Sequence, residues 1–122
     1  DPTTAFGFIC AQQSEDWSFY YFAITPAGQY AIIRATTGES DVFLTKTGKW
    51  ESSDLIKHKA SSYRIGADCG NGKLTLYVDG HKIVSVSDKT YTKGRVGLFV
   101  WSGEEASSAN IRFDDFLLAS LK

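Results

Sequence analysis

Residues 73–88, KLTLYVDGHKIVSVSD, decide the fold of this chain. Two short runs of β-forming residues, 74–78 and 82–86, flank the pair Asp79-Gly80. A two-residue hairpin turn needs positive φ angles, which glycine adopts without steric cost, so Asp-Gly between such runs is a strong hairpin signal. The stretch therefore predicts two antiparallel strands joined by a tight turn.

The rest of the chain repeats this pattern of short β-forming runs and turns. Further strands are expected at 5–12, 17–25, 29–35, 41–46, 62–69, 95–101 and 110–118. No stretch keeps a helical period, although a short helix is considered at 53–58. About nine strands at this spacing predict an all-β, antiparallel two-sheet sandwich in a single domain spanning residues 1–122.

The aromatic segment 17–25 has two apolar faces. Alternation along a strand places Tyr20, Phe22 and Ile24 on one face. Trp17, Phe19 and Tyr21 then lie on the other, so this strand is expected to be covered on both sides or to border a groove.

Two later strands show related patterns. In 95–101, Val96, Leu98 and Val100 share one face, and Arg95, Phe99 and Trp101 share the other. In 110–118 the apolar positions change parity between Phe113 and Phe116, so a bulge is expected near Asp114-Asp115.

Composition sets the broad class. The chain of 122 residues is 43% hydrophobic and 14% aromatic, enough to bury a core, and its net charge is −1. A nucleic-acid platform or a membrane-surface patch needs a basic excess, and no apolar run reaches the roughly 18 residues of a membrane span. We therefore expect no nucleic-acid partner and no membrane insertion. The chain lacks methionine, so it is expected to be a processed or excised piece of a longer protein. Its N-terminus has no basic region, so no signal peptide is expected in it.

Cys10 and Cys69 lie far apart, in separate apolar runs. They cannot form a local CxxC redox or metal motif. Two interpretations stay open: two buried thiols that pack as small hydrophobic groups, or one disulfide in an exported protein.

Several motifs follow one another in a characteristic order. They are FGFIC (6–10), FYYFAI (19–24), QYAIIR (29–34), IGADCGNGKLTLYVDG (65–80), IVSVSD (83–88), GRVGLFV (94–100) and IRFDDF (111–116). In this order they resemble bacterial extracytoplasmic domains of the concanavalin A-like lectin/glucanase superfamily, the laminin-G-like jelly rolls. The resemblance covers most of the chain, and its motifs are mainly structural. The hairpin turn in that family is more usually Asn-Gly than Asp-Gly.

The resemblance implies a jelly-roll sandwich that is secreted or displayed at the cell surface as part of a larger protein. It also favours the disulfide, because cysteines at the places of Cys10 and Cys69 recur in similar domains on neighbouring strands. Such domains usually carry further strands before the FGFIC run. The chain is therefore expected to lack N-terminal strands and to leave an unpaired edge, which is an association hazard.

Catalytic and metal chemistry find little support. Glycoside hydrolysis needs two carboxylates flanking the bond, and the alternating strand carboxylates of the glucanase branch are missing here. His58 and His81 are isolated, which disfavours zinc. No cofactor is expected. A structural calcium ion is the one metal that stays open, with Asp114 and Asp115 as first candidates and Asp79 or Asp88 as second candidates.

Carbohydrate binding is the function that the residues favour. Sugar rings stack on exposed aromatic faces while polar neighbours bind the hydroxyls. The predicted ligand-binding residues are Trp17, Tyr21, Trp50, Arg95, Phe99, Trp101, Glu104 and Glu105. The same aromatic side chains could instead form a covered second apolar layer.

The predicted function is therefore a non-catalytic module that binds an oligosaccharide or polysaccharide. The first alternative is a structural or protein-interaction domain whose aromatic face meets a protein partner or a neighbouring domain. A weaker alternative is a domain related to glycoside hydrolases.

Overall fold

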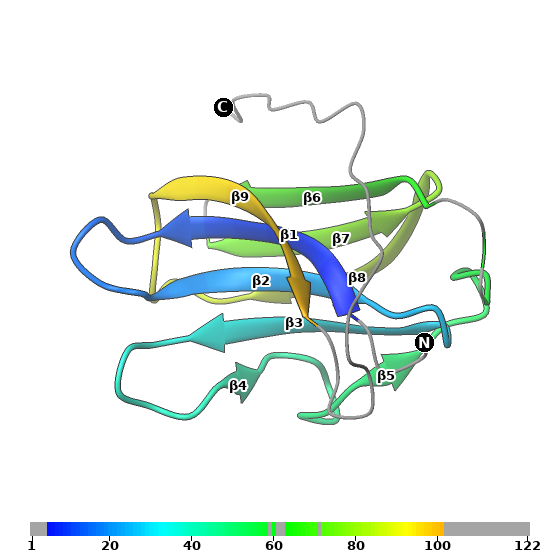
Figure 1. Ribbon diagram of the computed structural model, residues 1–122, viewed down its shortest axis with the longest axis horizontal. Helices are drawn as coiled ribbons and strands as arrows, with labels where there is room; N and C mark the ends of the chain where they lie inside the picture. Colours follow the sequence, from blue (N-terminus) through cyan, green and yellow to red (C-terminus); the bar gives the residue numbers. More distant parts are fainter. Residues whose placement is uncertain (1–4, 59, 61–62, 71, 102–122) are drawn as a thin grey trace.

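The computed structural model describes residues 5–58, 60, 63–70 and 72–101, with side chains through Leu98. Over this part the chain is all-β without a helix, and it forms two antiparallel sheets (Figure 1). No helix long and apolar enough to cross a membrane occurs among these residues.

The larger sheet has the strand order β4-β3-β2-β1-β9, and β5 also pairs with β3. Its strands are β1 (Ala5–Gln12), β2 (Phe19–Ile24), β3 (Gln29–Ala35), β4 (Val42–Phe43), β5 (Glu51–Ser52) and β9 (Arg95–Trp101). The smaller sheet, in the order β6-β7-β8, contains β6 (Ile65–Gly70), β7 (Lys73–Val78) and β8 (His81–Ser87).

The hairpin predicted at Asp79-Gly80 is confirmed. Both residues have positive φ, 51° and 84°, and Val78 pairs with His81 across the turn. The carboxylate of Asp79 also accepts a hydrogen bond from the backbone N–H of Arg64 at 3.0 Å, which ties the turn to the chain entering β6. The hairpin thus organises the whole smaller sheet.

One core lies between the two sheets. The predicted inner face of β2 is confirmed, because Tyr20, Phe22 and Ile24 are completely buried. Leu74 and Leu76 of β7 pack in the same cluster from the smaller sheet. The period-2 pattern of each strand is what allows both sheets to present an apolar face to the other.

The helix considered at 53–58 is wrong. These residues form turns, in which the N–H of Ile56 donates to the carbonyl of Ser53 at 3.2 Å. Ile56, 1% exposed, joins the core, while Leu55 beside it is exposed. A single buried side chain, that of Ile56, anchors this loop. A helix of one turn is not formed because its hydrogen bonds are too few to offset the conformational entropy lost in nucleating it.

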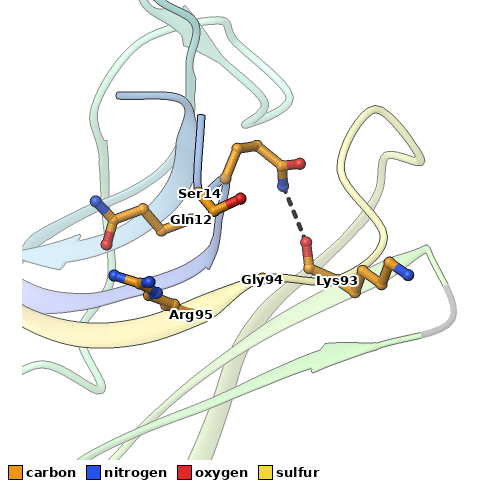
Figure 2. Close-up of a pocket in the computed structure, with 6 residues that line it drawn as sticks. Gln12, Ser14, Lys93, Gly94 and Arg95 are labelled. Carbon is orange, nitrogen blue, oxygen red and sulfur yellow. Dashed lines mark hydrogen bonds between the residues drawn. The ribbon is translucent and has the colours of Figure 1, made fainter. Parts of the chain in front are cut away.

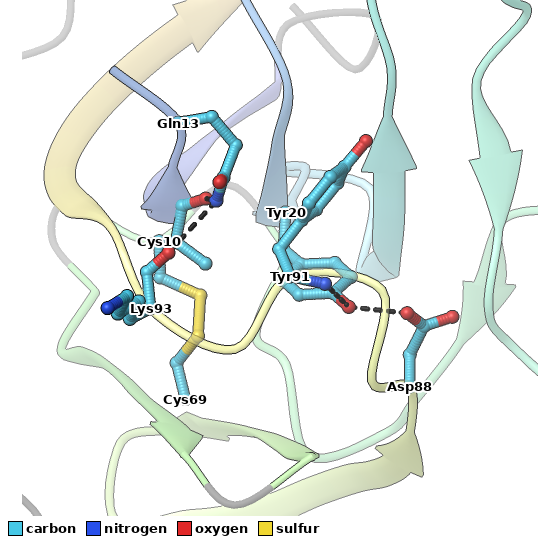
Figure 3. The surroundings of a disulfide bond; sticks show 8 residues. Cys10, Gln13, Tyr20, Cys69, Asp88, Tyr91 and Lys93 are labelled. Carbon is cyan, nitrogen blue, oxygen red and sulfur yellow. Dashed lines mark hydrogen bonds between the residues drawn. A yellow bond between two sulfur atoms is a disulfide. The ribbon is translucent and has the colours of Figure 1, made fainter. Parts of the chain in front are cut away.

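A disulfide joins the sheets. Cys10 of β1 and Cys69 of β6 are bonded, so of the two interpretations left open by the sequence the disulfide holds (Figure 3). Their Cα atoms lie 6.5 Å apart. This crosslink is compatible with an extracytoplasmic location.

Candidate functional site

An aromatic row lies on the outer face of the larger sheet, and we define it as Trp17, Phe19 and Tyr21. The ring centroids are 5.7 Å apart for Trp17–Phe19 and 5.8 Å apart for Phe19–Tyr21. Exposure is lowest in the middle of the row: Trp17 is 68% exposed, Phe19 is 8% exposed and Tyr21 is half-buried. The row therefore combines one exposed aromatic side chain, Trp17, with one buried aromatic side chain, Phe19.

The backbone of Trp17 is held at the entrance to β2. Its N–H donates to Thr37 Oγ1 at 2.9 Å, and the N–H of Thr37 donates to Ser18 Oγ at 3.0 Å. The N–H of Gln13 donates to the carbonyl of Ser18 at 2.9 Å, which closes the β1–β2 loop. The backbone of Trp17 is therefore held in place, and its exposed indole ring lies edge-on to the ring of Phe19.

Tyr21 connects the row to further aromatic residues. Strand register aligns Tyr21 with Ile33 and Ile33 with Phe43, so these side chains share the outer face. The ring of Phe43 in turn contacts Trp50, with centroids 6.0 Å apart. The Tyr21 hydroxyl donates to Asp41 at 2.6 Å, and burial, with this bond, raises the pKa of Tyr21. Tyr21 is thus a neutral, fixed donor at physiological pH.

A second feature at the same end of the larger sheet is a pocket of about 260 Å³. Six residues line it: Gln12, Gln13, Ser14, Lys93, Gly94 and Arg95. Gln12 closes β1 and pairs with Arg95 at the start of β9, after a register shift between Ile9 and Gln12. Figure 2 shows the Gln12 and Arg95 side chains lying side by side, with that of Lys93 pointing away from them.

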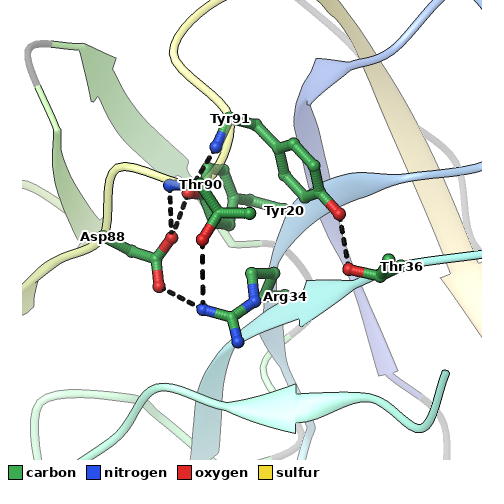
Figure 4. Close-up of polar contacts among 6 residues, drawn as sticks. All are labelled: Tyr20, Arg34, Thr36, Asp88, Thr90 and Tyr91. Atoms are coloured by element: carbon green, nitrogen blue, oxygen red, sulfur yellow. Dashed lines mark hydrogen bonds and ion pairs between the residues drawn. The ribbon is translucent and has the colours of Figure 1, made fainter.

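The loop between β8 and β9 is fastened to the larger sheet by an ion pair. Arg34 Nη1 lies 2.5 Å from Asp88 Oδ2, and the Tyr20 hydroxyl donates to Asp88 Oδ1 (Figure 4). Burial disfavours the charged carboxylate, but the hydrogen bonds from Tyr20 and Thr90 and the charge of Arg34 outweigh it and lower the pKa of Asp88. Burial and the bond to Asp88 raise the pKa of Tyr20 to about 12.

Tyr91 completes this attachment. Its N–H donates to the Tyr20 hydroxyl at 3.1 Å, and its own hydroxyl is hydrogen-bonded to Thr36 Oγ1 (Figure 4). Its ring packs against Tyr20 with centroids 5.4 Å apart. The loop that carries Lys93 and Gly94 to the pocket is therefore held by side chains of β2 and β3.

The two described calcium candidates are engaged within the fold. Asp88 pairs with Arg34, and Asp79 binds the N–H of Arg64. No group of three or more His, Cys, Asp or Glu side chains that could hold a metal ion occurs in the part of the chain that the structure describes. Asp114 and Asp115, with the bulge expected there, lie outside the described residues.

The predicted ligand-binding residues are thus placed to different degrees. Trp17 and Tyr21 belong to the aromatic row, Trp50 contacts Phe43 on the same outer face, and Arg95 lines the pocket. Phe99 and Trp101 are placed by their backbones, which pair with Gly7 and Ala5 of β1. Glu104 and Glu105 lie outside the described residues.

Sequence reasoning missed the polar residues that line the pocket together with Arg95: Gln12, Ser14 and Lys93. Gln12 and Ser14 come from the end of β1 and the loop after it, and Lys93 from the loop before β9, so the two segments are distant in sequence. The register shift that brings them together carries no residue signature that we recognise in the chain. Comparison with protein-family models, with curated proteins and with solved structures finds no match for this chain.

Proposed function

We propose that the chain is a non-catalytic carbohydrate-binding domain of an exported bacterial protein, with a concanavalin A-like jelly-roll topology. The two-sheet architecture and the disulfide support this proposal. The observation that carries it is the Trp17 indole, 68% exposed on a backbone pinned by Thr37. A large apolar ring left in water and held in place beside polar side chains is suited to stack against a sugar ring.

The binding mode follows from this arrangement. The apolar C–H face of a sugar would lie on the indole of Trp17. The hydroxyl groups would be bound by polar side chains at the same end of the sheet, among them Gln12 and Arg95. No pair of carboxylates with a catalytic role is needed, and the proposal is one of binding alone.

Isothermal titration calorimetry against a panel of oligosaccharides tests the proposal. We expect saturable binding to at least one glycan and a loss of affinity of about tenfold or more in Trp17→Ala, about 1.4 kcal/mol. Leu55→Ala is the matched control, because Leu55 is also a large exposed hydrophobic residue, 46% exposed, outside the proposed site. Circular dichroism establishes that both variants fold. An absence of binding across the panel, or unchanged affinity in Trp17→Ala, contradicts the proposal.

The edge of the larger sheet favours a second candidate function, assembly with another protein chain. Within the described residues β9 pairs only with β1, and its side chains Val96 and Leu98 are 41% and 36% exposed. Unpaired strand edges with apolar side chains are templates for pairing with another chain. Light scattering after size-exclusion chromatography should then show a concentration-dependent dimer that Val96→Lys abolishes. A monomer at every concentration would exclude it.

A further inference from the structure

The pocket at the ends of β1 and β9 is built on a distorted backbone. Ala11 adopts a positive φ of 55°, uncommon for a residue with a side chain, at the register shift that precedes Gln12. Gly94 packs so closely on this bulge that an added Cβ would lie 2.5 Å from the Gln12 carbonyl oxygen. Backbone distortions of this kind concentrate at functional sites, where the surrounding structure holds them.

The side chain of Gln13 holds the two walls of the pocket together. Its Nε2 donates to the carbonyl of Ala11 at 2.7 Å and to the carbonyl of Lys93 at 2.9 Å (Figure 3). One amide therefore bridges the bulge of β1 and the loop before β9. The pocket is fixed before any ligand arrives, so binding need not order these loops.

The remaining polar side chains of the pocket have no partner in the described part of the chain. Gln12, Ser14, Lys93 and Arg95 make no side-chain hydrogen bond there, and the ion pair of Arg34 with Asp88 is the one salt bridge. Two of these four groups are cations, and no carboxylate lines the pocket. The nearest acids in sequence, Glu15 and Asp16, are exposed further along the β1–β2 loop.

From this unpaired positive charge in a preformed pocket, we infer that the site takes the carboxylate of an acidic sugar, a uronic acid unit within a glycan. This inference rests on the proposed carbohydrate-binding function and specifies its ligand class. The guanidinium of Arg95 can bind a carboxylate with two parallel N–H donors, and Gln12 beside it can bind the neighbouring hydroxyl group. Lys93 lies two residues before Arg95 on the same wall; its side chain points away from Gln12 and Arg95, so it adds positive charge to the surroundings of the pocket without contacting the carboxylate (Figure 2). A volume of about 260 Å³ suits one sugar ring.

The test compares an oligogalacturonide with the same oligosaccharide after reduction of its carboxyl groups, by calorimetry in low salt. We expect the acidic form to bind about tenfold or more tightly than the reduced form, and the difference to shrink as salt is raised. Arg95→Gln should remove this difference, whereas Arg64→Gln, a control at an exposed arginine outside the pocket, should retain it. Trp17→Ala should weaken both ligands alike, because stacking does not depend on the carboxylate.

Each contrary result has a separate meaning. Equal affinity for the acidic and reduced forms overturns the acidic subsite and leaves the carbohydrate-binding proposal standing. A preference for the acidic form that survives Arg95→Gln places the anion elsewhere and also overturns the inference. Tight binding of sulfate with no binding of the oligosaccharide shows an anion site that is unrelated to glycans and overturns the inference. Failure of every glycan to bind removes the proposed function, and the subsite with it.

Discussion

Gly7 of β1 lies where the backbones of two strands approach closely, so Gly7→Ala is a direct test of the packing of β1 against β2. A Cβ added at Gly7 would lie 1.8 Å from the carbonyl oxygen of Phe22 in β2, closer than the 3.0 Å below which real Cβ contacts essentially never occur. The obstructing atom belongs to the backbone, so it cannot rotate away. The strands would have to separate by about 1 Å at this point, enough to break the hydrogen bonds beside it.

The expected cost follows from the position of the strand pair. β1 and β2 are adjacent inner strands of the larger sheet, and β2 carries the fully buried Tyr20, Phe22 and Ile24. Overpacking alone costs about 1–3 kcal/mol, and each buried backbone group left unpaired costs about 1–3 kcal/mol more. We therefore expect Gly7→Ala to lower the free energy of unfolding by roughly 3 kcal/mol or more, a large part of the 5–15 kcal/mol typical of a domain.

Urea unfolding followed by circular dichroism measures this loss. Gly97→Ala is the matched control, because Gly97 is a glycine of β9 whose added Cβ would meet no atom within 4 Å. We expect its unfolding midpoint to stay close to that of the parent chain. Equal midpoints for Gly7→Ala and Gly97→Ala would refute the close approach of β1 to β2.

Three further predictions concern the crosslink, the partly buried ion pair of Arg34 with Asp88, and the Tyr20 hydroxyl that donates to Asp88. Replacing Cys10 and Cys69 by alanine should lower the free energy of unfolding by about 4 kcal/mol in the chain-entropy model, because the disulfide closes a loop with a sequence separation of 59. Urea unfolding measures this loss, and an unchanged stability would contradict the prediction. The pKa of Asp88 in the folded chain lies below its unfolded value of about 3.9, so the ionised carboxylate stabilises the fold above pH 3.9. This stabilisation is lost as the pH falls through the folded pKa. The free energy of unfolding of Asp88→Asn, measured against pH, should therefore change less than that of the parent chain in this acid range. The pKa of Tyr20 is about 12 in the folded chain and about 10 in the unfolded chain, so the neutral hydroxyl stabilises the fold below pH 10, and this stabilisation is lost as the pH rises through 12. Tyr20→Phe should therefore lose less stability at alkaline pH than the parent chain. An identical alkaline transition in both would refute the raised pKa of Tyr20.

Local features of the sequence predicted the strands well. The bounds of β1, β3 and β9 agree with the expected 5–12, 29–35 and 95–101. The turn at Asp79-Gly80 and the buried face of Tyr20, Phe22 and Ile24 were also predicted. Turn chemistry and alternation are properties of a few consecutive residues, so they can be read without knowing what a strand pairs with.

The same local reasoning failed where distant segments decide. The short strand β5 was missed. The helix at 53–58 was wrong, because Ile56 packs in a core formed by other strands. In the candidate site, the sequence singled out Trp17, Tyr21, Trp50 and Arg95. It could not say that Trp17 is exposed while Phe19 beside it is buried.

The sequence by itself determined the class of fold, the main strands and the core-facing side chains of β2, whereas Val96 and Leu98, expected on the core-facing side of β9, are exposed. Only the tertiary structure decided that Cys10 and Cys69 are bonded, that Arg34 pairs with Asp88, and that Arg95 meets Gln12 and Ser14 in one pocket. These contacts join residues from separate strands and loops, through strand order and a register shift. Their energies depend on the whole arrangement of the two sheets, whereas a turn or an alternating strand depends on its immediate neighbours.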